Sequence, residues 1–113
     1  MASDATRYVQ VLGLHVTDDE RYRRYREGMS PILQRYGGGF GYDFVVSHVL
    51  ASESDSAINR VFTLWFPDRA RAGAFFADPG YLVVRRERFE GSVAAVTLIA
   101  AFDEPVPTAR APR

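Results

Sequence analysis

The two histidines are the side chains of this sequence whose ordinary pKa lies nearest to neutral pH, so a general acid or base would be drawn from them first. His15 lies in the apolar segment 8–16 and His48 in the apolar segment 40–50. Both segments are typical of β-strands. Each histidine therefore either faces a pocket, as a catalytic candidate, or occupies a strand end with a structural role.

A polar pairing follows if segment 40–50 and the next β-prone segment form a hairpin centred near Ser54. His48 would then lie opposite Arg60, and Asp43 opposite Trp65. An arginine beside His48 would disfavour the imidazolium and keep a neutral base available, while Arg60 would be free to hold an anionic ligand group. The alternative is a solvated edge pair that contributes under ~1 kcal/mol to stability.

Aromatic side chains on the same segments offer flat faces to an apolar or aromatic ligand. They predict either a cavity between two protomers or a filled interface, since both have similar composition. The aromatic set is Tyr8, Tyr42, Phe44, Phe62 and Trp65. We expect ligand binding by Tyr42, Asp43, Arg60 and Trp65, with His48, Arg60 and His15 as the catalytic candidates.

Two residue types are missing from the chain, and their absence excludes several chemistries. There is no cysteine, and all fourteen basic residues are arginine. Thiolate nucleophiles, disulfides, cysteine metal sites, lysine Schiff bases and lysine general bases are therefore excluded. Two histidines without a nearby carboxylate pattern make a weak ligand set, so we expect no metal and no cofactor.

Charge and hydropathy narrow the possible partners. Fourteen acidic residues balance the fourteen basic ones, so the chain has no net positive charge to attract the phosphate backbone of a nucleic acid. The arginines of segment 21–26 alternate with acidic residues on what should be a solvated helix face. No apolar run reaches the ~20 residues that a membrane helix needs. We expect a cytoplasmic protein that binds neither nucleic acid nor membrane.

The elements that would position these side chains follow the order strand, helix, strand, strand, helix, strand. The strands are expected at 8–16, 40–50, 58–66 and 93–102, with a polar turn at 51–57. Together they form a single α+β domain at 8–102, between a flexible N-terminus at 1–7 and a disordered tail at 103–113. Such a βαββαβ chain gives a ferredoxin-like, four-stranded antiparallel sheet with both helices on one face.

Local signals place the helix boundaries. Thr17 and Glu20 form a capping-box pattern at the start of the first helix, and Pro31 predicts a kink, or a break and restart, near 28–30. Gly37 is expected to end this helix, since glycine takes the left-handed cap conformation without a Cβ penalty. The second helix should follow Pro67-Asp68, with a further helical turn after Asp78-Pro79. We expect its inward-facing residues to be Ala70, Ala74, Phe75 and Ala77.

With these elements placed, the sequence resembles the family called domain of unknown function 1330, in the dimeric α+β barrel superfamily. The resemblance spans nearly all of the expected domain, and the order and spacing of its motifs agree throughout. The residues that carry it are Val16-Thr17-Asp18, Tyr22, Tyr25, Tyr36-Gly37-Gly38, Phe40, Phe66-Pro67, Ala74-Phe75-Phe76 and Asp78-Pro79-Gly80-Tyr81.

The resemblance implies a ferredoxin-like protomer that forms a homodimer through its exposed sheet face, and it implies no established activity. Two departures limit what transfers. Members often carry an arginine where this chain has Asp43, and a glutamate where it has Trp65. A ligand inferred from that arginine and glutamate would not transfer to this chain.

Two functions follow as expectations. The first is a small-molecule binding protein, or a cofactor-independent enzyme, that acts on an apolar or aromatic metabolite in a cavity near the sheet. The second is a noncatalytic dimerisation or sensing module whose interface is filled by side chains. The sequence leaves open whether the protein is catalytic.

Overall fold

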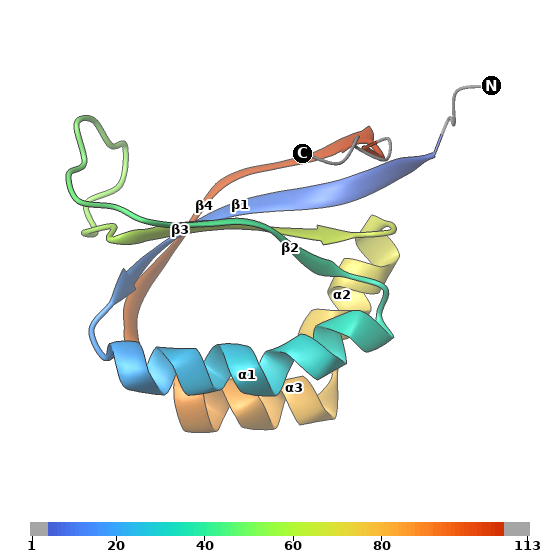
Figure 1. The fold of residues 1–113 in the computed structure, drawn as a ribbon, viewed down its shortest axis with the longest axis horizontal. Helices are drawn as coiled ribbons and strands as arrows, with labels where there is room; N and C mark the ends of the chain where they lie inside the picture. Colours follow the sequence, from blue (N-terminus) through green and yellow to red (C-terminus); the bar gives the residue numbers. More distant parts are fainter. Residues whose placement is uncertain (1–4, 108–113) are drawn as a thin grey trace, which may run out of the picture.

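One four-stranded antiparallel sheet with helices on one face makes up the fold, in a computed structural model that describes residues 5–107. The strand order is β2-β3-β1-β4. Figure 1 shows the helices as a second layer below the sheet. The predicted ferredoxin-like α+β arrangement is confirmed. The elements are β1 (Thr6–Val16), α1 (Asp19–Arg35), β2 (Gly39–Val45), β3 (Arg60–Phe66), α2 (Arg69–Ala77), α3 (Pro79–Val84), η1 (Arg85–Phe89, a π-helical turn) and β4 (Val93–Pro105).

The core lies between the sheet and the helices because alternate strand residues face the helical layer. On β3, Phe62, Leu64 and Phe66 are buried, whereas the residues between them are partly exposed on the opposite face. A buried stripe on α1 packs against them, and full burial of each such side chain contributes about 1.5–3 kcal/mol. That stripe is Tyr22, Tyr25, Met29, Ile32 and Leu33.

The first helix begins one residue later than the capping-box pattern suggested. Asp18, not Thr17, is the N-cap, and its carboxylate accepts a hydrogen bond from the backbone N–H of Arg21 at 3.0 Å. Thr17 is engaged elsewhere, since its backbone N–H and its hydroxyl both donate to the carbonyl oxygen of Ser92. This pair of bonds joins the end of β1 to the start of β4.

Pro31 does not break α1, which is one continuous helix from Asp19 to Arg35. The proline is exposed, while Met29 and Ile32 on either side of it are buried, so packing holds both halves on the core. The helix ends as predicted, with Gly37 at a φ of 76°. The backbone N–H of Gly38 then donates to Leu33 O, which satisfies a terminal carbonyl.

The β2–β3 hairpin is confirmed, but its predicted register is wrong. Val45 is the residue that lies opposite Arg60, and Asp43 lies opposite Phe62. β2 ends before His48, which is therefore in the connecting segment 46–59 and not on a strand. A bulge between Phe40 and Asp43 shifts the register further.

Asn59 explains where β3 begins. Its side chain accepts from Val16 N and donates to Val16 O, both at 2.8 Å. Its backbone N–H donates to Leu14 O, and its carbonyl accepts from Val46 N, both at 2.9 Å. This one residue ties the connecting segment to the end of β1, so the hairpin loop closes at 46 and 59 instead of near the predicted centre.

The second helical region follows its predicted caps but buries a different face. Asp68 caps α2 and Asp78 caps α3, each through its side chain, and Pro79 is at the first position of α3. Phe75 is buried as expected, with Ala72 as its buried partner. The predicted inward residues Ala70, Ala74 and Ala77 are exposed. The helical repeat explains the difference, since residues three positions apart share a helix face and Ala72 therefore lies on the same face as Phe75.

The first and last strands of the chain extend past the predicted domain limits of 8–102. β1 begins at Thr6 and β4 ends at Pro105, and these two residues pair with each other. Residues 1–4 and 108–113 of the predicted loose ends lie outside the described residues. Within residues 5–107, none of the helices has the length and apolarity needed to cross a membrane.

Candidate functional site

The sheet face that points away from the helices is apolar and open. At its β2 edge, Tyr42 and Phe44 stack at 5.7 Å between ring centroids and are 63% and 55% exposed. Trp65 on β3 pairs with Val9 on β1, which pairs in turn with Phe102 on β4. Apolar side chains therefore occur on all four strands of this face.

The connecting segment 46–59 rises above this open face, and a half-open pocket lies between the two. Figure 1 shows the segment on the side of the sheet opposite the helices. Thr97 on β4 donates a hydrogen bond to the hydroxyl of Ser54 at 3.3 Å, which joins the segment to the far edge of the sheet. The pocket has a volume of about 690 Å³, and its apolar lining is Val46, Val49, Leu50, Ala51, Ile58, Val61, Leu98 and Ile99.

A glycine on β1 makes room for this arrangement. A Cβ at Gly13 would lie 3.0 Å from Ile58 Cδ1 and 3.3 Å from Ile99 Cδ1. These distances are tighter than ordinary packing, so a larger residue at Gly13 would push both isoleucines outward. The absence of a side chain at Gly13 thus lets the connecting segment approach the sheet closely.

The two histidines have different surroundings. His48 lines the pocket beneath segment 46–59 and is exposed, together with the polar residues Ser52 and Glu53. His15 is partly buried on the open face of β1, opposite Ala95, and does not line that pocket. His48 reaches the pocket from a loop, although the sequence placed it on a strand.

Arg60 and Asp43 are brought together, but on the opposite side of the sheet from His48. The Nε atom of Arg60 is 3.9 Å from the carboxylate of Asp43, and Arg26 on α1 forms a close ion pair with the same carboxylate. Beneath them lies Tyr22, whose ring centroid is 5.1 Å from the Arg60 guanidinium carbon. We name Tyr22, Arg26, Asp43 and Arg60 the two-arginine cluster.

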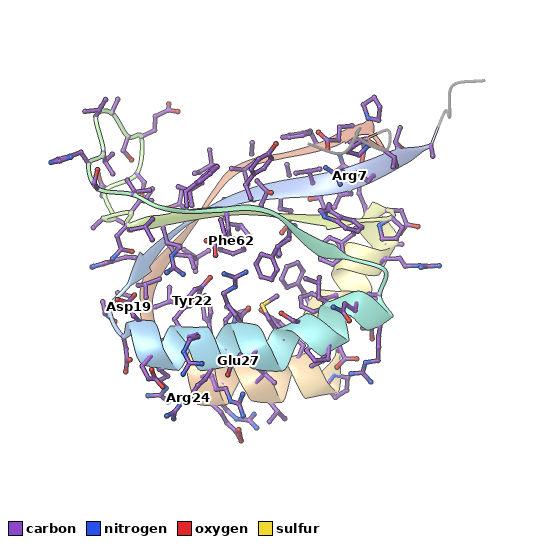
Figure 2. The ribbon with its side chains drawn as sticks, in the orientation of Figure 1. Arg7, Asp19, Tyr22, Arg24, Glu27 and Phe62 are labelled. Atoms are coloured by element: carbon purple, nitrogen blue, oxygen red, sulfur yellow. The ribbon has the colours of Figure 1, made fainter. Side chains whose placement is uncertain are left out.

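The two-arginine cluster lies at the rim between α1 and the β2–β3 hairpin. The side chains of Arg26, Asp43 and Arg60 are 31%, 24% and 20% exposed. Arg26 also packs its guanidinium 4.1 Å from the ring centroid of Phe40, a cation–π contact. Figure 2 shows Tyr22 rising from α1 toward the sheet, where Phe62 lies above it.

Two polar atoms of this cluster are buried without a hydrogen-bond partner among residues 5–107: the hydroxyl of Tyr22 and Nε of Arg26. An unpaired buried polar group costs about 1–3 kcal/mol. Burial raises the pKa of Tyr22 to about 12, although Arg26 and Arg60 act in the opposite direction. The phenol therefore keeps its proton at neutral pH and remains a hydrogen-bond donor.

The remaining predicted ligand residues, Tyr42 and Trp65, lie on the open face but outside the pocket. Trp65 is covered by Arg7, whose guanidinium carbon is 5.3 Å from the ring centroid, and Arg7 is itself paired with Glu104 at 2.7 Å. Trp65 lies opposite Gly39, not opposite Asp43. The six predicted residues thus fall into three groups: His48 in the pocket, Asp43 with Arg60 in the two-arginine cluster, and the others on the open sheet face outside the pocket.

Sequence reasoning missed Arg26 and Tyr22 as members of a polar site. Arg26 belongs to an arginine-rich segment whose other members are solvated: Arg23 pairs with Glu20 and Glu27 at 2.8 and 2.7 Å, and Arg24 points away from the sheet (Figure 2). The position of Arg26 in the helix could have indicated this contact, since Arg26 is four residues after the buried Tyr22 and so lies on the same face of α1.

No three histidine or acidic side chains of residues 5–107 gather closely enough to hold a metal ion.

Comparison with known protein families is consistent with this architecture. The family described as Domain of unknown function (DUF1330) matches residues 8–102. The chain belongs to this family. No curated protein matches this DUF1330 chain.

Solved structures similar to the DUF1330 chain share its fold at low sequence identity. RPA0582, a protein of unknown function from Rhodopseudomonas palustris, is 16% identical with a TM-score of 0.70, over 93% of this chain and 85% of that one. A dabb family protein with a ferredoxin-like fold from Mesorhizobium loti is 16% identical with a TM-score of 0.55, over 92% and 99%. A dimeric ferredoxin-like protein of unknown function from Thermobifida fusca is 7% identical with a TM-score of 0.54, over 94% and 96%.

Proposed function

We propose that this protein is a cytoplasmic homodimer that binds a small apolar or aromatic metabolite beneath segment 46–59. The pocket there is the observation that carries the proposal. Its volume of about 690 Å³ is within the range of small-molecule sites. Aliphatic side chains dominate its lining, and His48, Ser52 and Glu53 supply a few polar groups, which is the composition of a site for a mostly apolar ligand.

The exposure of the pocket rim supports a dimer. Leu50 borders the pocket and is 96% exposed, and Ile99 is 51% exposed. A second copy packed on the open face would cover these side chains and close the pocket from above. The Thermobifida fusca protein is described as dimeric, which is consistent with such an assembly.

The same pocket gives His48 its proposed role. It is the one imidazole that lines the pocket in the described chain, so it would orient a polar group of the ligand or exchange a proton with it. His15 on the same sheet face lies outside the pocket. The two histidines are therefore a matched pair for a test.

The experiment is a thermal-shift titration with the neutral probes indole and cyclohexanol, on the unmodified protein and on His48→Gln and Leu50→Ser. We expect both probes to raise the melting temperature of the unmodified protein, since a ligand that binds only the folded state stabilises it. Leu50→Ser should weaken both by about fivefold, roughly 1 kcal/mol. His15→Gln should bind as the unmodified protein does. Equal responses in all four proteins, or none in any, would overturn the pocket assignment.

A dimerisation module with a filled interface is the second candidate. The stacked pair Tyr42 and Phe44 favours it, because these aromatic side chains are exposed and lie outside the pocket. Apolar side chains at this position suit a protein–protein contact. A dimer that binds neither indole nor cyclohexanol would favour this candidate over the first.

A further inference from the structure

The two-arginine cluster carries more positive than negative charge. Arg26 and Arg60 share the single carboxylate of Asp43, and arginine stays protonated throughout the physiological pH range. Arg26 forms the close pair, whereas Arg60 approaches Asp43 only at 3.9 Å, which is longer than a hydrogen bond. One positive charge is left over at a partly buried place.

The unused hydrogen-bonding capacity of the cluster is almost entirely donor capacity. Nε of Arg26 can only donate, and so can the guanidinium nitrogens of Arg60. Tyr22 is 1% exposed, and its hydroxyl, a protonated phenol at neutral pH, donates to no acceptor among residues 5–107. A group that satisfies these donors must bring acceptor atoms, and a group that balances the charge must be an anion.

We infer that the two-arginine cluster is a binding site for a small carboxylate, held by Arg60, Nε of Arg26 and the hydroxyl of Tyr22. The net charge of the cluster matches a monovalent anion better than a divalent phosphate. A planar carboxylate also suits guanidinium groups, which donate two parallel hydrogen bonds to it. Arg26, Asp43 and Arg60 are 20–31% exposed at the rim of the hairpin, whereas the Tyr22 hydroxyl and Nε of Arg26 are buried, so a ligand reaches these two donors only when the rim side chains move apart.

This site is separate from the pocket beneath segment 46–59. Arg60 and Asp43 face the helical layer, whereas Val61 and Ile58 face the pocket on the other side of the sheet. The inference therefore does not rest on the proposed function. A neutral ligand on the open face and an anion at the two-arginine cluster would bind independently.

The test is a titration with sodium acetate. Binding is measured by the change in melting temperature and by the ¹H–¹⁵N resonance of the Arg26 side-chain Nε. Sodium chloride at equal ionic strength is the reference, and sodium phosphate is the second arm. We expect acetate to raise the melting temperature more than chloride does and to move the Arg26 resonance along a saturating curve. Phosphate should bind more weakly than acetate.

Three variants localise the effect. Arg60→Gln should weaken acetate binding at least tenfold, and Tyr22→Phe, which keeps the ring, should weaken it several-fold. Arg69→Gln is the control, since Arg69 is 64% exposed and stacks on Tyr8, which pairs with Phe66 at the opposite end of β3 from Arg60. It should bind acetate as the unmodified protein does.

Several results would overturn the inference. An acetate response equal to that of chloride would exclude the site. Unchanged binding in both Arg60→Gln and Tyr22→Phe would place acetate elsewhere. Tighter binding of phosphate than of acetate would exclude a carboxylate as the preferred ligand.

Discussion

Tyr22 and Tyr25 are neighbours on the buried stripe of α1, yet their hydroxyl groups have opposite surroundings. The Tyr25 hydroxyl is 2.8 Å from that of Tyr81, in a hydrogen bond that either atom can donate. The Tyr22 hydroxyl is buried without a partner in the described chain. Burial raises the pKa of both phenols, so both are neutral in the physiological range.

We expect Tyr→Phe substitutions at these two positions to change stability in opposite directions. In chloride buffer, Tyr22→Phe should leave the free energy of unfolding unchanged or raise it by up to about 1 kcal/mol, because an unsatisfied hydroxyl is removed. Tyr25→Phe should lower it by about 1–2 kcal/mol, because Tyr81 loses its partner. Urea denaturation of both variants measures the difference. Equal losses would show that the Tyr22 hydroxyl is satisfied in solution.

At the residue scale, the observed partners of the predicted site residues differ from the expected ones. Asp43 lies 3.9 Å from Arg60 and not opposite Trp65, and its close partner is Arg26, a residue that the sequence analysis assigned to a solvated surface. The pairing of Arg26 with Asp43 joins a helix to a strand across the layer between them. Spacing along one element cannot show such a contact, because it depends on how two elements pack.

At the scale of elements, the glycines of the helical side offer a direct test of packing. A Cβ at Gly73 in α2 would meet nothing within 4 Å, whereas a Cβ at Gly38 would lie 2.8 Å from both Leu33 Cδ1 and the carbonyl oxygen of Trp65. Gly73 therefore lowers helix stability without any benefit to packing, and Gly38 permits a close approach of the chain to β3.

Gly73→Ala should raise the free energy of unfolding by about 0.5–1 kcal/mol, since alanine loses less backbone freedom on helix formation. Gly38→Ala should lower it by about 1–3 kcal/mol through overpacking against a backbone atom. Thermal and urea unfolding of the two variants measures whether the free energy of unfolding rises or falls in each. A loss of stability in Gly73→Ala would show that α2 packs differently from the arrangement described.

Element order and type were predictable from the sequence because each strand and helix carries its own periodicity. The helix N-caps were also largely predictable. Asp68 and Asp78 cap α2 and α3 as expected, but the N-cap of α1 is one residue later than predicted because Thr17 is hydrogen-bonded to Ser92. The hairpin register was not predictable. It depends on the hydrogen bonds of Asn59 to the end of β1, which is distant in sequence. It also depends on the bulge in β2, which no local sequence pattern predicted.

At the scale of the whole molecule, the open sheet face is the main unexplained surface of a single copy. Phe44, Ile99 and Phe102 are 55%, 51% and 39% exposed, and they come from both edges of the sheet. Apolar side chains spread this widely over one face mark an interaction surface. The homodimer proposed above would bury them.

We expect Phe44→Lys to disrupt the dimer, because burial of an unpaired charge in an apolar interface is strongly unfavourable. Sedimentation velocity at micromolar concentration should give about twice the 12.7 kDa chain mass for the unmodified protein and the single-chain mass for the variant. Leu82→Lys is the control, since Leu82 is 43% exposed on α3, in the helical layer. Dissociation of the control alone would place the interface on the helices.

Segment 46–59 is fastened unevenly, and this determines how a guest molecule could enter beneath it. Its base is held by four hydrogen bonds of Asn59 at 2.8–2.9 Å, three of them to the backbone at the end of β1. Within residues 5–107, the one hydrogen bond that joins its tip to the sheet is that of Thr97 with the Ser54 hydroxyl at 3.3 Å. Regions with fewer and weaker contacts open at lower free energy than the body of a fold. The tip can therefore move away from the sheet while every strand stays paired. A ligand can then enter beneath the segment without partial unfolding of the sheet.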